Sequence, residues 1–264
     1  MAEQSLSGKT ALITGASSGL GVDFARELAS RGANLVLVAR RQDLLERVAA
    51  EIRDASGVEV HVVATDLADD AARARLAVDL QDAGRHVDVL VNNAGLGVFG
   101  DFREVDWSRT QQMLEVDVVA LTHLTRLFVN GMVERKEGWI LQVGSTGSFQ
   151  PSPGYAAYSA AKAYVLSLGH ALHFELRGTG VSCTTVCPGV TATEFLQVSG
   201  QQKTWFHKMT MMDSPSVAKL GVSGMLKRRP EIVTGWMNAL TAFTTRFTPR
   251  PLMARVAWWA MRNE

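Results

Sequence analysis

The sequence has only two cysteines, which excludes a scaffold held together by many disulfides. Cys183 and Cys187 lie four residues apart in a strand-like run, VSCTTVCPG, so at strand rise their Cα atoms would be about 13 Å apart. A disulfide needs Cα atoms within about 7 Å, and we therefore expect two unpaired core thiols. His170 and His173 lack a convincing third ligand nearby, so no metal site is predicted.

An excess of one charge and a long apolar run are also missing. With 27 basic and 26 acidic residues the net charge is +1, which gives no electrostatic reason to expect nucleic acid or an anionic membrane as a partner. Seven prolines and 23 glycines are near average usage, which excludes collagen-like and disordered chains. No basic-then-apolar leader is visible and no apolar run approaches the roughly 18 residues that span a bilayer, so a soluble cytoplasmic protein is expected.

What the sequence does contain is an alternation of short apolar runs and longer amphipathic stretches. Strands are predicted within KTALITG, NLVLVAR, VEVHVVATD, VDVLVNNAG, WILQVGS, VSCTTVCPG and EIVTG. Helices are predicted at about residues 20–30, 43–55, 69–83, 108–135 and 158–177. Parallel strands need crossover connections, so this alternation predicts an α/β fold: a doubly wound parallel sheet of about seven strands with helices on both faces. No linker or repeat divides the chain, and residues 1–264 are predicted to form one domain.

The residues after the first predicted strand form a glycine-rich turn. LITGASSGLG runs through Gly15, Gly19 and Gly21 into a helix that begins near Leu20. Glycine permits a tight turn and close approach of a pyrophosphate to the backbone, and a helix N-terminus supplies free N–H groups. Such a turn can also be an ordinary strand-to-helix connection, but its position directly after a first strand favours dinucleotide binding.

The end of the second predicted strand, VLVARRQDLLE, bears on which dinucleotide is bound. An acid here would bind the ribose 2′-hydroxyl of NAD, whereas arginine accommodates the 2′-phosphate of NADP. Arg40 and Arg41 stand where that acid would stand. They could simply be solvated, but positive charge at the start of a helix opposes the helix dipole, which favours a phosphate-binding role. We therefore predict NADP rather than NAD, and read Asp43 as an acid of the helix's first turn.

The stretch VGSTGSFQPSPGYAAYSAAK, at the end of the fifth predicted strand, carries residues suited to proton transfer. Tyr158 and Lys162 are four residues apart on one helix face, so the ammonium group can favour ionisation of the phenol. A lone tyrosine titrates at about 10, too high for efficient proton transfer at neutral pH. Ser145 is placed to hydrogen-bond a carbonyl oxygen. Tyr155 lies about two turns from Lys162 and is the poorer candidate.

One acid falls on the apolar face of a predicted helix. In MLEVDVVALTHLT, the residues three and four positions either side of Asp117 are all apolar. An ionised carboxylate in that place needs partners, or its pKa rises until the group is neutral.

Taken in order, these residues resemble the single-domain short-chain dehydrogenases/reductases from about Gly8 to Thr193. The matching segments are the glycine motif Thr14, Gly15, Ala16, Ser17, Ser18, Gly19, Leu20 and Gly21; the adenine contact Asp66 and Leu67; the NNAG motif Asn92, Asn93, Ala94 and Gly95; Ser145, followed thirteen residues later by Tyr158 and then Lys162; and Pro188 and Gly189 with Thr193, which hold the nicotinamide carboxamide.

The resemblance implies a Rossmann-type fold and an NADP(H)-dependent interconversion of a ketone and a secondary alcohol. Tyr158 would donate the proton, Ser145 would hold the carbonyl oxygen, and Lys162 would bind the nicotinamide ribose and tune Tyr158. The resemblance also implies a homodimer or homotetramer formed through the helices after the fourth and fifth strands. A non-catalytic NADP(H)-binding redox sensor is the alternative function, against which the intact Ser145, Tyr158 and Lys162 argue.

By the family's spacing, Asp117 falls where these enzymes usually carry an asparagine that braces the active site. If protonated, Asp117 offers a donor and an acceptor as an amide does; if ionised, it only accepts and adds negative charge near Lys162. We therefore predict a working enzyme with a displaced pH profile. A purely structural brace is the alternative, because a buried carboxylate can be fully hydrogen-bonded without catalytic duty.

Residues 191–213 occupy the place of the family's substrate lid. Their apolar members are Phe195, Leu196, Trp205, Phe206, Met209, Met211 and Met212, and Phe99, Phe102 and Phe149 are further candidates for the same pocket. Methionine and aromatic side chains form an adaptable apolar wall, so we expect a bulky hydrophobic carbonyl or alcohol, of ketosteroid, 3-oxoacyl or aromatic ketone type, rather than a sugar. The same residues could instead cover the core or a subunit contact.

Residues 235–264 are predicted to form a C-terminal helical extension. Val256, Trp259 and Ala260, with arginines beside them, suggest a short amphipathic helix. Packing against the domain or a second subunit is the expected role, and peripheral docking on a membrane surface is the alternative.

Overall fold

The computed structural model of the 264-residue chain describes residues 4–193, 195–202 and 210–261. Seven strands form one sheet in the order β3-β2-β1-β4-β5-β6-β7, and every neighbouring pair is parallel. The strands are β1 Thr10–Thr14, β2 Asn34–Ala39, β3 Val60–Ala64, β4 Val89–Asn92, β5 Gly138–Val143, β6 Val181–Cys187 and β7 Glu231–Val233. The predicted Rossmann-type sheet and all seven predicted strands are confirmed.

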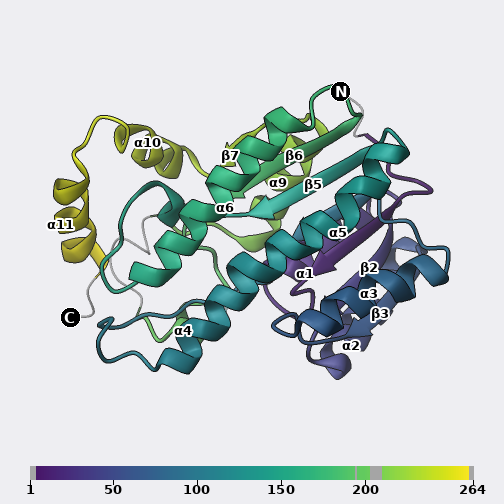
Figure 1. Ribbon diagram of the computed structural model, residues 1–264, viewed down its shortest axis with the longest axis horizontal. Coiled ribbons are helices and arrows are strands. Elements are labelled where there is room, and N and C mark those ends of the chain that lie inside the picture. Colours follow the sequence, from purple (N-terminus) through teal and green to yellow (C-terminus); the bar gives the residue numbers. More distant parts are fainter. Residues whose placement is uncertain (1–3, 194, 203–209, 262–264) are drawn as a thin grey trace.

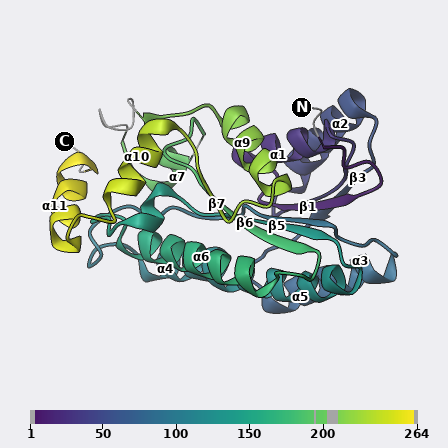
Figure 2. The ribbon, with the colours of Figure 1, turned by 90° about the horizontal axis from the view of Figure 1, so that it is seen from above.

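Helices cover both faces of this sheet. They are α1 Leu20–Ala29, α2 Gln42–Ser56, α3 Asp70–Asp82, α4 Trp107–Leu114, α5 Leu121–Glu134, α6 Ala156–Glu175, α7 Phe195–Ser199, α9 Ser214–Leu226, α10 Trp236–Thr244 and α11 Arg250–Met261. Figure 1 shows the sheet from one face. Figure 2, turned by 90°, shows it from its edge, with α1, α2 and α9 on one side and α3, α5 and α6 on the other. The sequence did not predict α7 or α9.

Successive side chains of a strand point to opposite faces of the sheet, so the protein has a separate apolar core on each face. In β1, Ile13 faces the core beneath α1 and α9, whereas its neighbour Leu12 faces the core beneath α5. Leu37 and Val38 of β2 divide in the same way. All four side chains are fully buried, and each such side chain contributes roughly 1.5–3 kcal/mol by leaving water. The central strands therefore read as continuous apolar runs because both of their faces are covered.

The strand order reverses at β1, whose two neighbours in the sheet are β2 and β4. The register pairs Ile13 with Val91, so the residues after β1 and β4 emerge side by side at the carboxyl edge. The loops after these two strands run in opposite directions, which opens a crevice at that edge.

The helix predicted over residues 108–135 is present but is not uniform. Between α4 and α5 lies a π-helical segment, η1, from Glu115 to Ala120, and Asp117 is within it. By length and composition the whole stretch Trp107–Glu134 is apolar enough to cross a membrane, which corrects the expectation that no such run exists. The stretch packs against β4, β5 and α6, as a core helix does.

Cys183 and Cys187 are buried and unpaired on β6, as predicted. Burial raises the pKa of the Cys183 thiol to about 12, so this sulfur stays protonated and unreactive. Three of the predicted lid residues, Trp205, Phe206 and Met209, lie outside the described residues.

Candidate active site

A cavity of about 500 Å³ opens at the carboxyl edge of the sheet. The predicted site residues that line it are Gly15, Ser17, Ser18, Gly19, Leu20, Arg40, Arg41, Asp66, Leu67, Asn93, Gly95, Asp117, Ser145, Tyr158, Lys162, Pro188, Gly189 and Thr193. Six different strands position these residues, so the tertiary structure brings together segments that are up to 178 residues apart (193 − 15 = 178). Gly21 and Ala94 are not part of the lining.

The glycine turn after β1 is shaped by two left-handed residues and one close contact. Gly15 and Gly19 have φ of 68° and 56°, values that favour glycine. A Cβ on Gly21 would lie 2.3 Å from the Gly15 carbonyl oxygen, so Gly21 permits close packing rather than contact with a ligand. Gly19 caps α1 without a side-chain hydrogen bond, which leaves the N–H groups of Leu20 and Gly21 available to an anion, whereas the Val22 N–H donates to the Gly19 carbonyl oxygen at 3.1 Å.

The NNAG segment holds this turn in place through hydrogen bonds with Thr14. Asn93 Nδ2 donates to the Thr14 carbonyl oxygen at 2.8 Å, and Thr14 Oγ1 accepts from the backbone N–H groups of Asn93 and Ala94, both at 2.9 Å. Ala94 therefore acts through its backbone. The bracing by Thr14 was not predicted, because a hydroxyl at a strand end gives no distinctive sequence signal.

Arg41 lies at the end of the cavity nearest β2. Its Nη2 donates to Ser18 Oγ at 3.0 Å and to Ser17 Oγ at 3.2 Å, so the guanidinium group reaches the glycine turn. Arg41 also occupies the N-cap position of α2, and Asp43 lies in the first turn as predicted. Arg40 lines the cavity beside it.

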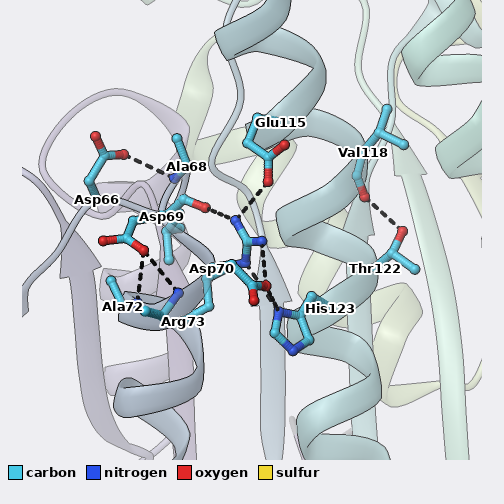
Figure 3. A network of polar contacts seen from close by, with 12 residues as sticks. Asp66, Ala68, Asp69, Asp70, Ala72, Arg73, Glu115, Val118, Thr122 and His123 are labelled. Carbon is cyan, nitrogen blue, oxygen red and sulfur yellow. Dashed lines mark hydrogen bonds and ion pairs between the residues drawn. The ribbon is translucent and has the colours of Figure 1, made fainter.

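The turn after β3 is tied to the π-helical segment by a buried arginine (Figure 3). Arg73 is 1% exposed and donates to the Leu67 carbonyl oxygen at 2.6 Å and to Glu115 Oε1 at 3.0 Å. Asp66, next to Leu67, accepts from the Ala68 N–H at 3.0 Å. The same arginine thus fixes the predicted adenine contact and the segment that carries Asp117. Arg73 was not predicted as a site residue, because in the sequence it looks like an ordinary residue of an amphipathic helix.

Tyr158 and Lys162 project from one face of α6, as the four-residue spacing predicted. Lys162 Nζ lies 5.6 Å from the centre of the Tyr158 ring and donates to the Val143 carbonyl oxygen at 3.1 Å. Ser145 follows β5 by two residues and caps the 3₁₀ helix η2, Thr146–Phe149, by accepting from the Gly147 N–H at 3.0 Å. That cap holds the Ser145 hydroxyl at the cavity wall, where it lowers the pKa of the Tyr158 phenol and so favours its ionised form.

Asp117 forms an ion pair with Lys162. Its Oδ2 lies 2.9 Å from Lys162 Nζ, and its Oδ1 accepts from the Leu96 N–H at 2.7 Å. The Asp117 side chain is completely buried. Oδ2 has no well-directed hydrogen bond among the described residues, so its contact with Lys162 is mainly one of charge. Both groups that approach the carboxylate are donors, which favours the ionised form.

The pKa values in this cluster are coupled. Burial raises the pKa of the Tyr158 phenol, the Lys162 ammonium opposes that rise, and the Asp117 carboxylate adds to it. Burial by itself would lower the pKa of Lys162, but Asp117 and Tyr158 outweigh burial and raise it. Burial raises the pKa of Asp117 against the opposing pull of Lys162. Lys162 therefore stays charged, and Asp117 offsets part of its effect on Tyr158.

Aromatic rings form the wall next to the phenol. The rings of Phe195 and Tyr155 lie 5.5 and 5.4 Å from that of Tyr158, and Phe99 packs on Tyr155 at 5.0 Å. The Tyr155 hydroxyl is 2.8 Å from Ser199 Oγ, and burial raises its pKa, so Tyr155 is a wall residue, not the acid.

Several predicted pocket residues do not reach the cavity. Leu196 lines it together with Phe195, as expected. Met211, Met212, Phe99, Phe102 and Phe149 are not among the lining residues. Phe102 is 67% exposed on a loop before α4, where water surrounds it.

The C-terminal extension supplies part of the cavity, a role that was not predicted from the sequence. Asn238, Thr241, Ala242 and Thr245 line it, with the i, i+3, i+4, i+7 spacing of one helix face. Asn238 is 5% exposed and donates to the Thr234 carbonyl oxygen at 2.8 Å. A stripe of small and polar residues on an otherwise apolar helix is the sequence pattern that could have indicated this cavity-lining face.

Comparison with known proteins identifies the family. The short chain dehydrogenase family matches residues 9–204, so the chain belongs to that family and is an oxidoreductase acting on CH–OH groups. An uncharacterized oxidoreductase of Myxococcus xanthus is 32% identical, covering 97% of this chain and 98% of its own. A very-long-chain 3-oxoacyl-CoA reductase of Anas platyrhynchos is 31% identical, covering 90% of this chain and 77% of its own.

Solved structures show the same fold. A short-chain dehydrogenase from Sphingobium yanoikuyae in complex with NADPH has a TM-score of 0.81 at 31% identity, covering 90% of this chain and 94% of its own. A short-chain dehydrogenase/reductase from Burkholderia phymatum in complex with NAD has a TM-score of 0.82 at 29% identity, covering 91% and 94%. The family thus includes complexes with either dinucleotide.

The residues of this chain fit a nicotinamide dinucleotide. Free N–H groups at the start of α1 suit a pyrophosphate, and the buried Leu67 lies beside the cavity where an adenine needs an apolar contact. Asn93, Lys162, Pro188 and Gly189 line the same cavity.

Proposed function

We propose that this enzyme uses NADPH to reduce a bulky hydrophobic ketone to a secondary alcohol, and that it can catalyse the reverse oxidation. The observation that carries the proposal is a single cavity with Arg41 and the glycine turn at one end and Ser145, Tyr158 and Lys162 at the other. A phosphate-binding end and a proton-donating end in one enclosed space suit transfer of a hydride and a proton to the same carbonyl group.

The side chains of this enzyme supply the proton and the positioning. When bound, NADPH supplies a hydride to the carbonyl carbon. Ser145 holds the carbonyl oxygen by hydrogen bonding, and Tyr158 donates its phenolic proton to that oxygen as the alcohol forms. Lys162 binds the nicotinamide ribose and keeps positive charge beside the phenol, and Asp117 fixes its position through the 2.9 Å ion pair.

NADP rather than NAD is proposed because of the charge at the β2 end of the cavity. Arg41 is exposed and lies within hydrogen-bonding distance of both serines of the glycine turn, so its guanidinium group can close over a 2′-phosphate. No carboxylate follows β2 until Asp43, which belongs to α2. The supply of NADPH in cells favours the reductive direction.

The substrate class is proposed from the wall opposite the cofactor end. Phe195, Leu196, Tyr155 and Ala242 present apolar surface to the cavity beside Tyr158. Such a wall suits a ketosteroid, a long 3-oxoacyl chain or an aromatic ketone better than a sugar. The 3-oxoacyl-CoA reductase relative supports the acyl alternative.

We also propose a cytoplasmic homodimer or homotetramer that associates through α5 and α6. Val119 on η1 and Tyr164 on α6 are 43% and 41% exposed. Thr122 and Tyr164 hydroxyls are 3.0 Å apart, which joins these helices into one surface. Light scattering should give a mass of at least twice 28.6 kDa.

One observation favours the redox-sensor alternative: Asp117 already pairs with Lys162, the residue that the family uses at the nicotinamide ribose. A sensor would bind NADPH without turning it over.

The proposed function is tested by assaying hydrophobic ketones and alcohols with both NADPH and NADH. We expect turnover with NADPH, and a loss on the order of 10³-fold in Tyr158→Phe with NADPH binding retained. Binding without turnover of any ketone would support the sensor, and equal activity with NADH would refute the proposed role of Arg41.

A further inference from the structure

The helix α10 has two faces of opposite character. One face lines the cavity, as described above. Trp236, Leu240 and Phe243, at spacings of four and three residues, project on the other face, and Phe247 continues this stripe just beyond the helix. These four side chains are 53–76% exposed, and the rings of Phe243 and Phe247 are in contact at 5.3 Å.

The helix α11 extends this apolar surface. Leu252, Val256, Trp258 and Trp259 are 51–60% exposed, whereas Met253 and Ala257 are buried beneath them. Both views place α10 and α11 together at the end of the molecule opposite α2 and α3 (Figures 1 and 2). Eight large apolar side chains therefore face solvent at one end of the protein, more than scattered exposure would produce.

Every charged residue from position 232 to 261 is an arginine. Arg246, Arg250 and Arg255 are exposed, and the guanidinium group of Arg246 lies 5.9 Å from the centre of the Phe243 ring. The overall charge of +1 hides this local excess, because the acids lie elsewhere in the chain.

The charges discriminate between the partners that could cover this surface. A second copy docked across a two-fold axis would bring the arginines of both chains together, with no acid from the same segment to pair with them. An anionic bilayer offers opposite charge and an apolar interior, and Trp, Phe and Arg are the residues typical of interfacial helices.

We propose that this α10–α11 surface docks the enzyme on an anionic phospholipid membrane. Trp236, Phe243 and Phe247 enter the interface while Arg246, Arg250 and Arg255 bind lipid phosphates. Because the inner face of α10 lines the cavity, docking brings the substrate end of the cavity to the bilayer, where an apolar ketone concentrates. This last step rests on the proposed function, whereas the docking itself does not.

Co-sedimentation of the full chain with sucrose-loaded vesicles tests the docking. We expect binding to vesicles of phosphatidylcholine with phosphatidylglycerol, and much weaker binding to phosphatidylcholine alone. Arg246→Gln/Arg250→Gln/Arg255→Gln should lower the partition coefficient on the order of a hundredfold. The control Arg47→Gln/Arg75→Gln/Lys227→Gln removes the same charge from exposed positions on α2, on α3 and at the end of α9, and should retain binding.

The contribution of apolar contact with the bilayer is tested by Trp236→Gln/Phe247→Gln. We expect this variant to lower the partition coefficient at least about tenfold. The matched control is Val78→Gln/Leu220→Gln, at exposed positions on α3 and α9. All four variants should keep wild-type turnover of a water-soluble ketone, which shows that they are folded.

Two outcomes would overturn the proposal. One is wild-type protein that stays in the supernatant with both vesicle types. The other is a particle mass by light scattering that falls in Trp236→Gln/Phe247→Gln without vesicles present, which would assign the surface to a second copy. Absence of ketone turnover would instead refute the proposed function and leave the sedimentation result standing.

Discussion

On the cofactor side of the cavity the functional groups follow the strands β1 to β6 or stand on η1 and α6, whereas on the substrate side they stand on α7 and α10. The first group is fixed by sheet register and by buried hydrogen bonds such as those of Thr14 and Asn93. The second group is held by aromatic contacts and by α10 packing on β7 and η2. Substitutions on the cofactor side should therefore lower activity with every substrate. Substitutions on the substrate side should change activity with some substrates and not with others.

Lys162→Met should give the largest effect, because it leaves the buried Asp117 carboxylate without its ion-pair partner. We expect a loss of roughly 3–5 kcal/mol in the free energy of unfolding, measured by urea denaturation at pH 7, and near-complete loss of kcat. Lys162→Met/Asp117→Leu should recover most of the stability but none of the activity. Equal stability of the two variants would show that the carboxylate is already neutral.

Arg41→Ala should give the second largest effect. Removing a guanidinium group that binds a phosphate costs roughly 1.5–3 kcal/mol, so KM for NADPH should rise about 10- to 100-fold. KM for NADH should stay unchanged, because NADH has no 2′-phosphate. The exposed Arg47, on the same helix, provides the control as Arg47→Ala. A parallel rise with both cofactors would indicate a structural defect of the turn.

Asp117→Asn should displace the pH profile by about one unit. The Asp117 carboxylate raises the pKa of Tyr158, so its removal lowers that pKa. Reduction needs the protonated phenol and is lost as pH rises through the Tyr158 pKa, so its alkaline limb should move to lower pH. Oxidation needs the phenolate, so its activity should appear at lower pH. Superimposable profiles for the variant and wild type would reduce Asp117 to a structural brace.

The smallest effect is expected on the substrate side. Thr241→Leu adds bulk to the cavity and should raise KM for a bulky ketone about fivefold, with kcat/KM for acetone-sized ketones unchanged. Thr244→Leu is the matched control, since Thr244 is exposed on the same helix and is not a lining residue. Identical changes for small and bulky ketones would contradict a specificity role for α10.

Local patterns predicted the cofactor side well. Alternating apolar runs predicted the seven strands, because each strand is buried on both faces. The four-residue spacing of Tyr158 and Lys162 predicted their shared helix face. Asp117 was predicted to lie at this site, but its protonation state was left open between an ionised and a neutral carboxyl. The ion pair with Lys162 depends on how η1 packs against α6, which periodicity does not report.

The substrate side was predicted poorly for a physical reason. Met211, Met212, Phe102 and Phe149 are apolar like the true wall residues, and composition alone does not say which apolar side chain turns inward. The π-helical insertion at η1 and the buried network of Arg73 are likewise outcomes of packing between elements.

The sequence by itself determined the parallel sheet, the glycine turn and the placement of Tyr158 and Lys162 on one helix face, because each depends on residues that are neighbours along one strand, turn or helix. Only the tertiary structure decided that Asp117 meets Lys162, that α10 closes the cavity, and that its other face stays exposed beside three arginines. Those contacts join segments far apart in the chain, and their geometry follows from the packing of whole helices on the sheet.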